Sequence, residues 1–145
     1  MINEKDFVGL DVGKFEIFVF IGTSATAFSV SNTPSGYALI QNKIGKPGAQ
    51  IIALEPTGSY EWGVWETLDR AEYDVRQISV AHVRAFARAT GALAKTDPID
   101  ARLITKFMAF RPDSGRKLPA KKLHILNALS SKHRQMVEVR KCVKC

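Results

Sequence analysis

Apolar residues gather in short runs along the first 110 positions, separated by polar or Gly-containing breaks. Three runs near the N-terminus, at residues 6–10, 15–21 and 24–30, have the length and the Phe, Ile and Val content of strands. Because the turns between them are short, they predict an antiparallel meander. Two later runs, at residues 50–54 and 73–78, predict a fourth and a fifth strand.

Between and after these strands, apolar residues recur every three or four positions, as they do on one face of a helix. Helices are therefore expected over residues 33–44, 59–70, 80–89 and 97–110. The first begins at Thr33-Pro34, where Thr suits the N-cap and Pro the first helical position. A meander followed by strand–helix–strand units predicts an α/β fold, in which helices flank a mixed five-stranded sheet.

The last part of the chain follows a looser apolar pattern. Its apolar residues fit a heptad seam: Ile125, Leu129, Met136, Val139 and Val143. Such a seam favours pairing between helices, so a homo-oligomer joined through this C-terminal helix is expected. We therefore divide the chain into an α/β domain over residues 1–111 and a helical segment over residues 112–145, which has the pattern of the start of a coiled coil.

Charge separates the same two parts. The 145 residues include 21 Lys or Arg and 14 Asp or Glu, a formal net charge of +7. Residues 1–110 hold 11 basic and 12 acidic residues, whereas residues 111–145 hold 10 basic and 2 acidic ones. A basic tail on a neutral domain indicates nucleic acid or an acidic membrane surface as the partner. The sequence has no apolar run of about 18 residues, so we expect no membrane span.

The two cysteines, Cys142 and Cys145, form one C-x-x-C at the last residues. A single pair is not a disulfide framework, and the acidic N-terminus does not match a signal peptide. A reducing cytoplasm is therefore the expected location. The pair could be half of a zinc site, but the sequence offers no second pair.

Four carboxylates stand at the ends of predicted elements. Asp11 follows the first strand, Glu55 follows the fourth, and Asp97 and Asp100 begin the last helix of the domain. Strands one and four are commonly neighbours in such sheets, so Asp11 and Glu55 are expected to meet at one sheet edge. The i, i+3 spacing of Asp97 and Asp100 places both on one helix face. Clustered carboxylates suit Mg²⁺ or Mn²⁺, and two such ions can serve phosphodiester chemistry.

Each acid also has a purely structural interpretation. Asp11 precedes Val-Gly and suits a turn. In the Asp97-Pro98-Ile99-Asp100 segment, Asp97 suits the N-cap of the helix, and Asp100 can close a capping box from the third helical position. The two interpretations are compatible, because a capping carboxylate keeps a second oxygen free.

Three motifs occur in order along the domain. They are GLDVGK at residues 9–14, LEPTGSY at residues 54–60 and KTDPIDA at residues 95–101. Together they resemble the DEDD transposases, which comprise Piv/MooV-like invertases and bridge-RNA-guided insertion-sequence recombinases. The resemblance covers about residues 6–111. It implies a RuvC-like, ribonuclease-H-like fold and a catalytic tetrad of Asp11, Glu55, Asp97 and Asp100 that binds Mg²⁺ or Mn²⁺. It also implies recombination of DNA by an oligomer that carries a structured guide RNA.

The resemblance is not complete. Family members continue into a C-terminal domain that supplies a nucleophilic serine, and Ser130-Ser131 do not match that motif. We therefore expect an N-terminal, truncated chain that is not competent for full recombination alone.

Basic residues near the acids and in the tail are candidates for contacts with nucleic-acid phosphates. They are Lys95, Arg84, Arg88, Arg102, Arg116, Lys117, Lys121, Lys122, Lys132, Arg134, Arg140 and Lys141. Those of the domain are equally explained as a solvated face, whereas the density in the tail favours nucleic acid.

Two other functions remain open. The chain could be a non-catalytic RNA- or DNA-binding module, in which the acids are caps and turns. Residues 11–14 after a strand also resemble the first phosphate loop of sugar-kinase/actin-like ATPases. Those ATPases need a second lobe and a second glycine-rich loop, for which the sequence has no room.

Overall fold

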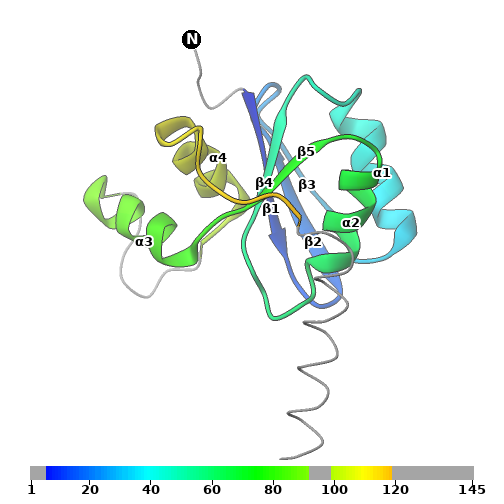
Figure 1. Ribbon diagram of the computed structural model, residues 1–145, viewed down its shortest axis with the longest axis horizontal. Coiled ribbons are helices and arrows are strands. Elements are labelled where there is room, and N and C mark those ends of the chain that lie inside the picture. Colours follow the sequence, from blue (N-terminus) through cyan, green and yellow to red (C-terminus); the bar gives the residue numbers. More distant parts are fainter. Residues whose placement is uncertain (1–5, 92–98, 119–145) are drawn as a thin grey trace, which may run out of the picture.

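A five-stranded mixed sheet lies between two pairs of helices in the computed structural model, which describes residues 6–91 and 99–118 (Figure 1). The strands are β1 (Phe7–Val12), β2 (Glu16–Ile21), β3 (Thr26–Ser31), β4 (Ile51–Leu54) and β5 (Asp74–Gln77). The helices are α1 (Pro34–Ile44), α2 (Trp62–Arg70), α3 (Val80–Ala89) and α4 (Ala101–Phe110). The sheet order is β3-β2-β1-β4-β5, with β1, β2 and β3 antiparallel and β4 and β5 parallel to β1. The expected α/β class and mixed sheet are confirmed, and the topology is consistent with a RuvC-like, ribonuclease-H-like fold.

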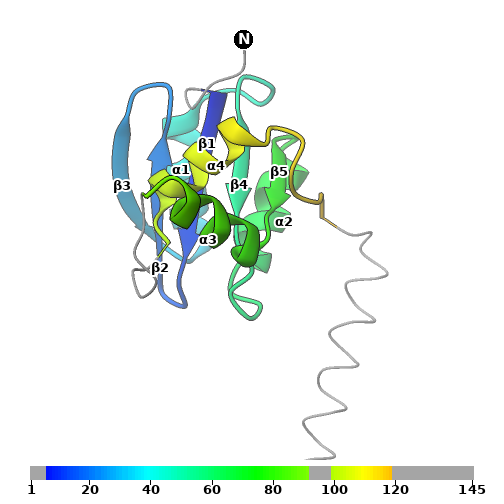
Figure 2. The ribbon, with the colours of Figure 1, turned by 90° about the vertical axis from the view of Figure 1, so that its left-hand side faces the viewer.

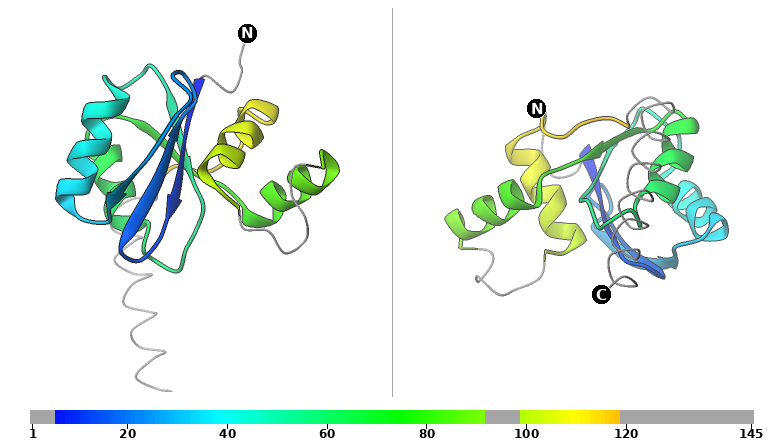
Figure 3. Two further views of the ribbon diagram at one scale, coloured as in Figure 1. Left: turned by 180° about the vertical axis from the view of Figure 1, so that it is seen from behind. Right: turned by 60° about the horizontal axis from the view of Figure 1, so that its bottom comes forward.

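The two sheet faces bury separate cores because strand side chains alternate between faces. Val8, Leu10 and Val12 of β1 pack towards α1 and α2, together with the fully buried Trp65. Phe7 and Ala53 face the other way and pack against α3 and α4. Figure 3 shows these two layers from behind, with one helix pair on each side. Asp11 lies four residues after Phe7, and Glu55 lies two residues after Ala53. Their side chains are therefore on the sheet face that α3 and α4 cover.

Gly9 allows α4 to approach β1 closely. A Cβ atom at Gly9 would lie 2.0 Å from the Ala101 carbonyl oxygen, so a larger residue does not fit without movement of the helix. Ile104, Phe107 and Met108 of α4 are fully buried on this face. Burial of side chains of this size contributes about 1.5–3 kcal/mol each, which fixes the helix on the sheet. The first turn of α4 is consequently held beside Asp11.

Two helices begin later than the sequence pattern predicts. Helix α4 starts at Ala101 rather than at residue 97, and Asp100 is its N-cap. The expected capping box and the placement of Asp97 and Asp100 on one helix face are therefore wrong, since Asp100 precedes the helix; Asp97 lies outside the described residues. Helix α2 starts at Trp62 rather than at residue 59, because Ser59 has a φ of 100°, which is incompatible with a right-handed helix.

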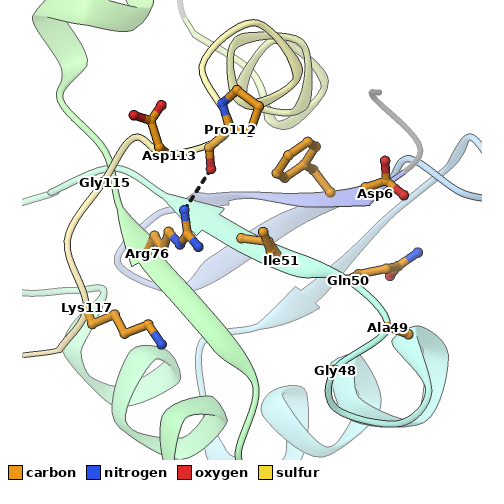
Figure 4. Close-up of a pocket in the computed structure, with 11 residues that line it drawn as sticks. Asp6, Gly48, Ala49, Gln50, Ile51, Arg76, Pro112, Asp113, Gly115 and Lys117 are labelled. Carbon is orange, nitrogen blue, oxygen red and sulfur yellow. Dashed lines mark hydrogen bonds between the residues drawn. The ribbon is translucent and has the colours of Figure 1, made fainter. Parts of the chain in front are cut away.

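The first residues of the basic segment lie along β5. The backbones of Gln77 and Arg116 exchange two hydrogen bonds, of 2.9 and 3.0 Å. Arg76 donates from Nη1 to the Pro112 carbonyl oxygen at 2.7 Å (Figure 4). The segment up to residue 118 is thus attached to the domain. The predicted heptad seam falls within residues 119–145, outside the described residues.

None of the helices in the described part of the chain is long and apolar enough to cross a membrane.

Candidate active site

Asp11 and Glu55 lie at the same edge of the sheet. β1 and β4 are parallel neighbours, as expected, and their register pairs Leu10 with Leu54. Glu55 directly follows β4, whereas Asp11 lies within β1, which continues to Val12 and pairs Asp11 with Phe18 of β2. The expected place of Asp11 after the first strand, and its interpretation as a turn residue, are therefore wrong. The two acids still occupy neighbouring positions directly after the Leu10–Leu54 pair. Asp11 is half-buried, and Glu55 is 8% exposed. The position at the carboxyl ends of parallel strands is where α/β proteins commonly form their sites.

Asp100 joins them from the start of α4. Its Oδ1 atom accepts a hydrogen bond of 2.7 Å from the Leu103 amide, which caps the helix. A carboxylate has two oxygens, so capping leaves the other available. The close packing of Gly9 on Ala101 places this cap next to β1. The side chain that caps α4 is therefore also close enough to Asp11 to raise the pKa of that carboxyl.

The three carboxylates influence one another electrostatically. Burial, followed by the charge of Asp11, raises the pKa of Glu55 from 4.5 to about 7, and the positive charge of Arg84 partly opposes the rise. Burial, followed by the charge of Asp100, raises the pKa of Asp11. Each shift means that ionising these groups together is unfavourable in the absence of a further cation. The edge has the electrostatic character of a cation-binding site.

The donor chemistry fits a hard divalent ion, because carboxylate oxygens are the ligands that Mg²⁺ and Mn²⁺ prefer. Within residues 6–91 and 99–118, however, no three Asp, Glu, His or Cys side chains are arranged as a ligand set for a metal. Asp97, the fourth predicted acid, lies outside those residues. Asp11, Glu55 and Asp100 therefore provide carboxylate oxygens that suit a divalent ion, but they do not form a complete set of ligands by themselves.

A buried carboxylate that the sequence pattern did not reveal supports the loop after Glu55. Glu61 is 2% exposed, and its Oε2 accepts from the Thr57 amide at 3.1 Å and from the Thr57 hydroxyl at 2.9 Å. Its Oε1 accepts from Gln77 Nε2 at 3.2 Å, and Gln77 Oε1 accepts from Arg116 Nε at 2.9 Å. A Glu near a helix N-terminus is usually an exposed residue facing the helix dipole, so sequence alone gave no signal of this network.

The predicted phosphate-binding residues fall in different places. Arg84 is half-buried on α3, near enough to Glu55 to influence its pKa, and Arg88 is exposed on the same helix. Arg102 is exposed on α4, with its guanidinium 5.6 Å from the centre of the Phe20 ring.

Arg116 and Lys117 lie by β5. The guanidinium of Arg116 lies 5.8 Å from the centre of the Trp65 ring, and Lys117 Nζ is 3.9 Å from Asp74. The others lie outside the described residues: Lys95, Lys121, Lys122, Lys132, Arg134, Arg140 and Lys141.

A cavity of about 660 Å³ at the opposite edge of the sheet does not include any of the acids described above. Phe7 and Ile51, at the starts of β1 and β4, line it. Figure 4 shows Ile51 together with Arg76 and Lys117, which also line the cavity. Both basic groups contact Asp74, at 3.1 and 3.9 Å. Arg76 and Lys117 are thus paired within the chain.

Comparison with known protein families agrees with this geometry. A transposase family model of the DEDD type, from the IS110 group, matches residues 8–145. The chain belongs to the DEDD transposase family. The match begins in β1, includes the positions of all four predicted acids and continues through the basic segment of this DEDD transposase. None of the curated proteins compared with the chain matches it. Membership makes transposition of DNA the activity of the family and favours the transposase interpretation over the ATPase one.

Proposed function

We propose that this DEDD transposase domain is the metal-binding catalytic domain of a DNA recombinase, with Asp11, Glu55, Asp97 and Asp100 as its catalytic and metal-binding residues. The observation that carries the proposal is the convergence of three of these acids from separate elements. Asp11 and Glu55 follow a register pair of β1 and β4, and Asp100 caps α4 beside them. The local structure requires only the cap, because Asp11 lies within β1 and Glu55 directly follows β4.

The residues at this edge would have different roles in binding the metal ions and the DNA. Asp11, Glu55 and Asp100 would hold Mg²⁺ or Mn²⁺ together with Asp97, and Glu61 would keep the loop after Glu55 in place through Thr57. The bound ions would supply stabilisation of the charge on the attacking and leaving oxygens of a phosphodiester. Arg84, whose charge already acts on Glu55, would face the phosphates of the substrate.

We further propose that the basic tail binds nucleic acid, including a structured guide RNA, and that its apolar seam pairs chains in an oligomer. The support is the ratio of 10 basic to 2 acidic residues over positions 111–145. Charge of this density neutralises phosphates and releases their counterions. The seam and these basic residues lie on the same segment, so one helix would serve both purposes.

Thermal unfolding in Mg²⁺ or Mn²⁺ tests the catalytic proposal. Either ion is expected to raise the melting temperature of the wild type but not of an Asp11→Asn/Glu55→Gln variant, because a ligand stabilises only a state that binds it. Asp69→Asn/Glu72→Gln is the matched control, since it removes two exposed acids, one in the last turn of α2 and one in the turn before β5. Equal metal shifts in all three proteins would support the non-catalytic binding module instead.

A further inference from the structure

A second cavity opens directly beside the acidic edge. It has a volume of about 690 Å³ and lies between strands β2 and β3 and the start of α4. Asp11 and Asp100 line it as well as belonging to the acidic site. The strands contribute two aromatic residues of the same sheet face to its wall, Phe18 and Phe20. Its volume is that of a small-molecule site, for which about 300–1,000 Å³ is typical.

Phe18 is the unusual residue of this cavity. It is the direct cross-strand partner of Asp11 in the β1–β2 ladder, on the sheet face that carries Asp11. Directly opposed side chains in a sheet lie about 5 Å apart at Cβ. Although it lies within a strand, Phe18 is 51% exposed. An exposed aromatic ring next to a catalytic candidate indicates a contact with a ligand more than a contribution to the core.

The exposure of Phe18 follows from its neighbours. On β3 its partner is Ser29, and the next position on the same face is Ala27, which pairs with Phe20. Both side chains are small, so they leave the ring uncovered. Phe20, by contrast, is only 8% exposed, and the guanidinium of Arg102 on α4 lies 5.6 Å from the centre of its ring. Figure 2 shows β3 lying beyond the area that α3 and α4 cover.

The charges around the cavity favour a nucleotide over other ligands. Arg102 lines the cavity and brings a guanidinium to it, and guanidinium groups bind phosphate. On the other side, Asp11 and Asp100 carry the carboxylates of the acidic edge. A DNA strand has a flat base for Phe18 and a phosphate for Arg102, and its next phosphodiester would reach the acidic edge through the metal ions of the proposed function. An apolar peptide offers no phosphate to Arg102, and a phospholipid offers no flat ring to Phe18.

We propose that Phe18 is a stacking platform for an unpaired nucleobase of the DNA strand that carries its phosphodiester to Asp11. The inference rests on the proposed function, since it assumes that a DNA strand reaches the acidic edge. A base must be unpaired or displaced to present its face to a ring that lies within the sheet. Stacking on aromatic rings tolerates any base, so the platform would position the strand without reading its sequence.

Binding of single-stranded DNA to the full chain tests the inference. The probe is a short oligonucleotide with one 2-aminopurine, whose fluorescence is quenched on stacking, in buffer with EDTA. Phe18→Ala is expected to weaken binding about 5- to 100-fold and to abolish the quenching, because one stacked base contributes that much. Phe18→Tyr should bind like the wild type. Leu39→Ala is the control, because Leu39 is also 51% exposed but lies on α1, across the sheet.

Unchanged binding and quenching in Phe18→Ala, or equal losses in Phe18→Ala and Leu39→Ala, would overturn the inference. If Phe18→Ala melts at a lower temperature, Phe18→Leu keeps the test valid: it retains an apolar side chain without an aromatic face and should bind as weakly as the Ala variant. A loss confined to single-stranded RNA would overturn the assignment to DNA.

The measurement is independent of the metal proposal because EDTA is present throughout. Weaker binding by Phe18→Ala without any metal response of the wild type would leave the stacking platform standing and reject the catalytic function. A metal response that depends on Asp11 and Glu55, with unchanged DNA binding by Phe18→Ala, would reject the platform alone.

Discussion

Glu55 is the residue whose surroundings most oppose its charge. Burial and the neighbouring Asp11 raise its pKa to about 7, so the folded chain binds this proton more tightly than the unfolded chain does. Stability therefore falls as the pH rises from below 4.5 to above 7, the window between the ordinary and the raised pKa. A buried carboxylate whose ionisation lowers the stability of the fold is typical of a functional site.

Replacing Glu55 by Gln should remove this pH-dependent loss. We expect Glu55→Gln to be more stable than the wild type by ~1–3 kcal/mol at about pH 8 in the absence of divalent ions, and nearly equal at about pH 4.5. Urea unfolding at both pH values measures the difference. Glu72→Gln, at an exposed acid, should show no such dependence. A Glu55→Gln variant that is less stable at the higher pH would show that the charge is already compensated.

The close packing of Gly9 against α4 can be tested by a single substitution. Gly9→Ala should destabilise the chain by ~1–3 kcal/mol, because the added methyl would overlap the Ala101 carbonyl and push α4 outward. The variant should also lose metal stabilisation, since Asp100 moves with the helix. Gly13→Ala is the control, as its Cβ would approach nothing nearer than the Glu16 carbonyl oxygen at 3.1 Å. Thermal melts with and without Mg²⁺ report both effects, and equal metal shifts in the two variants would contradict this role of Gly9.

At the scale of elements, the network around Glu61 links helix α2 to the loop after β4 and to the end of β5. Glu61→Ala should cost ~2–3 kcal/mol, because the Thr57 amide and Gln77 Nε2 would be left without their buried acceptor. Glu66→Ala is the control on the same helix: Glu66 pairs with Arg70 at the surface, and such a pair contributes less than ~1 kcal/mol. Denaturant unfolding compares them, and similar losses of stability would show that the network contributes little.

The elements themselves were largely predictable from the sequence, and helix starts were the main exception. Within residues 6–91 and 99–118, strand alternation and helical periodicity predicted the five strands and four helices, and the pairing of β1 with β4 followed from the fold class. The start of α4 was not predictable, because Asp97-Pro98 and Asp100 both have the residue types of a helix start. Only tertiary packing of Ala101 on Gly9 distinguishes them.

The site was predictable to the extent that its residues lie in motifs. Asp11, Glu55 and Asp100 were singled out by their positions at element ends, whereas Glu61 and Phe18 were not. Burial of Glu61 depends on donors 4 and 16 residues away. Exposure of Phe18 depends on the small Ser29 across the ladder. Contacts between residues on different elements do not appear in the periodic pattern of apolar residues, so the sequence does not predict them.

At the scale of the whole molecule, positive charge concentrates in the segment after residue 110. Changing six of its basic residues to Gln should weaken RNA and DNA binding and lower the salt slope by roughly 0.7–0.9 for each phosphate that the variant no longer neutralises. The six are Lys121, Lys122, Lys132, Arg134, Arg140 and Lys141. Fluorescence anisotropy over a range of salt concentrations measures both quantities. A control that neutralises Lys43, Lys46 and Arg70 of the domain should keep the slope, and equal slopes in the two variants would place the phosphate-binding residues elsewhere.

The central claim is that the acids at the ends of β1 and β4 hold a divalent metal ion. The most direct test is Mn²⁺ binding followed by electron paramagnetic resonance, which counts free and bound ions. Saturable Mn²⁺ binding is expected for the wild type and for Asp69→Asn/Glu72→Gln. Binding at least ~10-fold weaker is expected for Asp11→Asn/Glu55→Gln, since loss of two charged ligands removes more than about 1.4 kcal/mol. Equal Mn²⁺ binding by all three proteins would contradict the account.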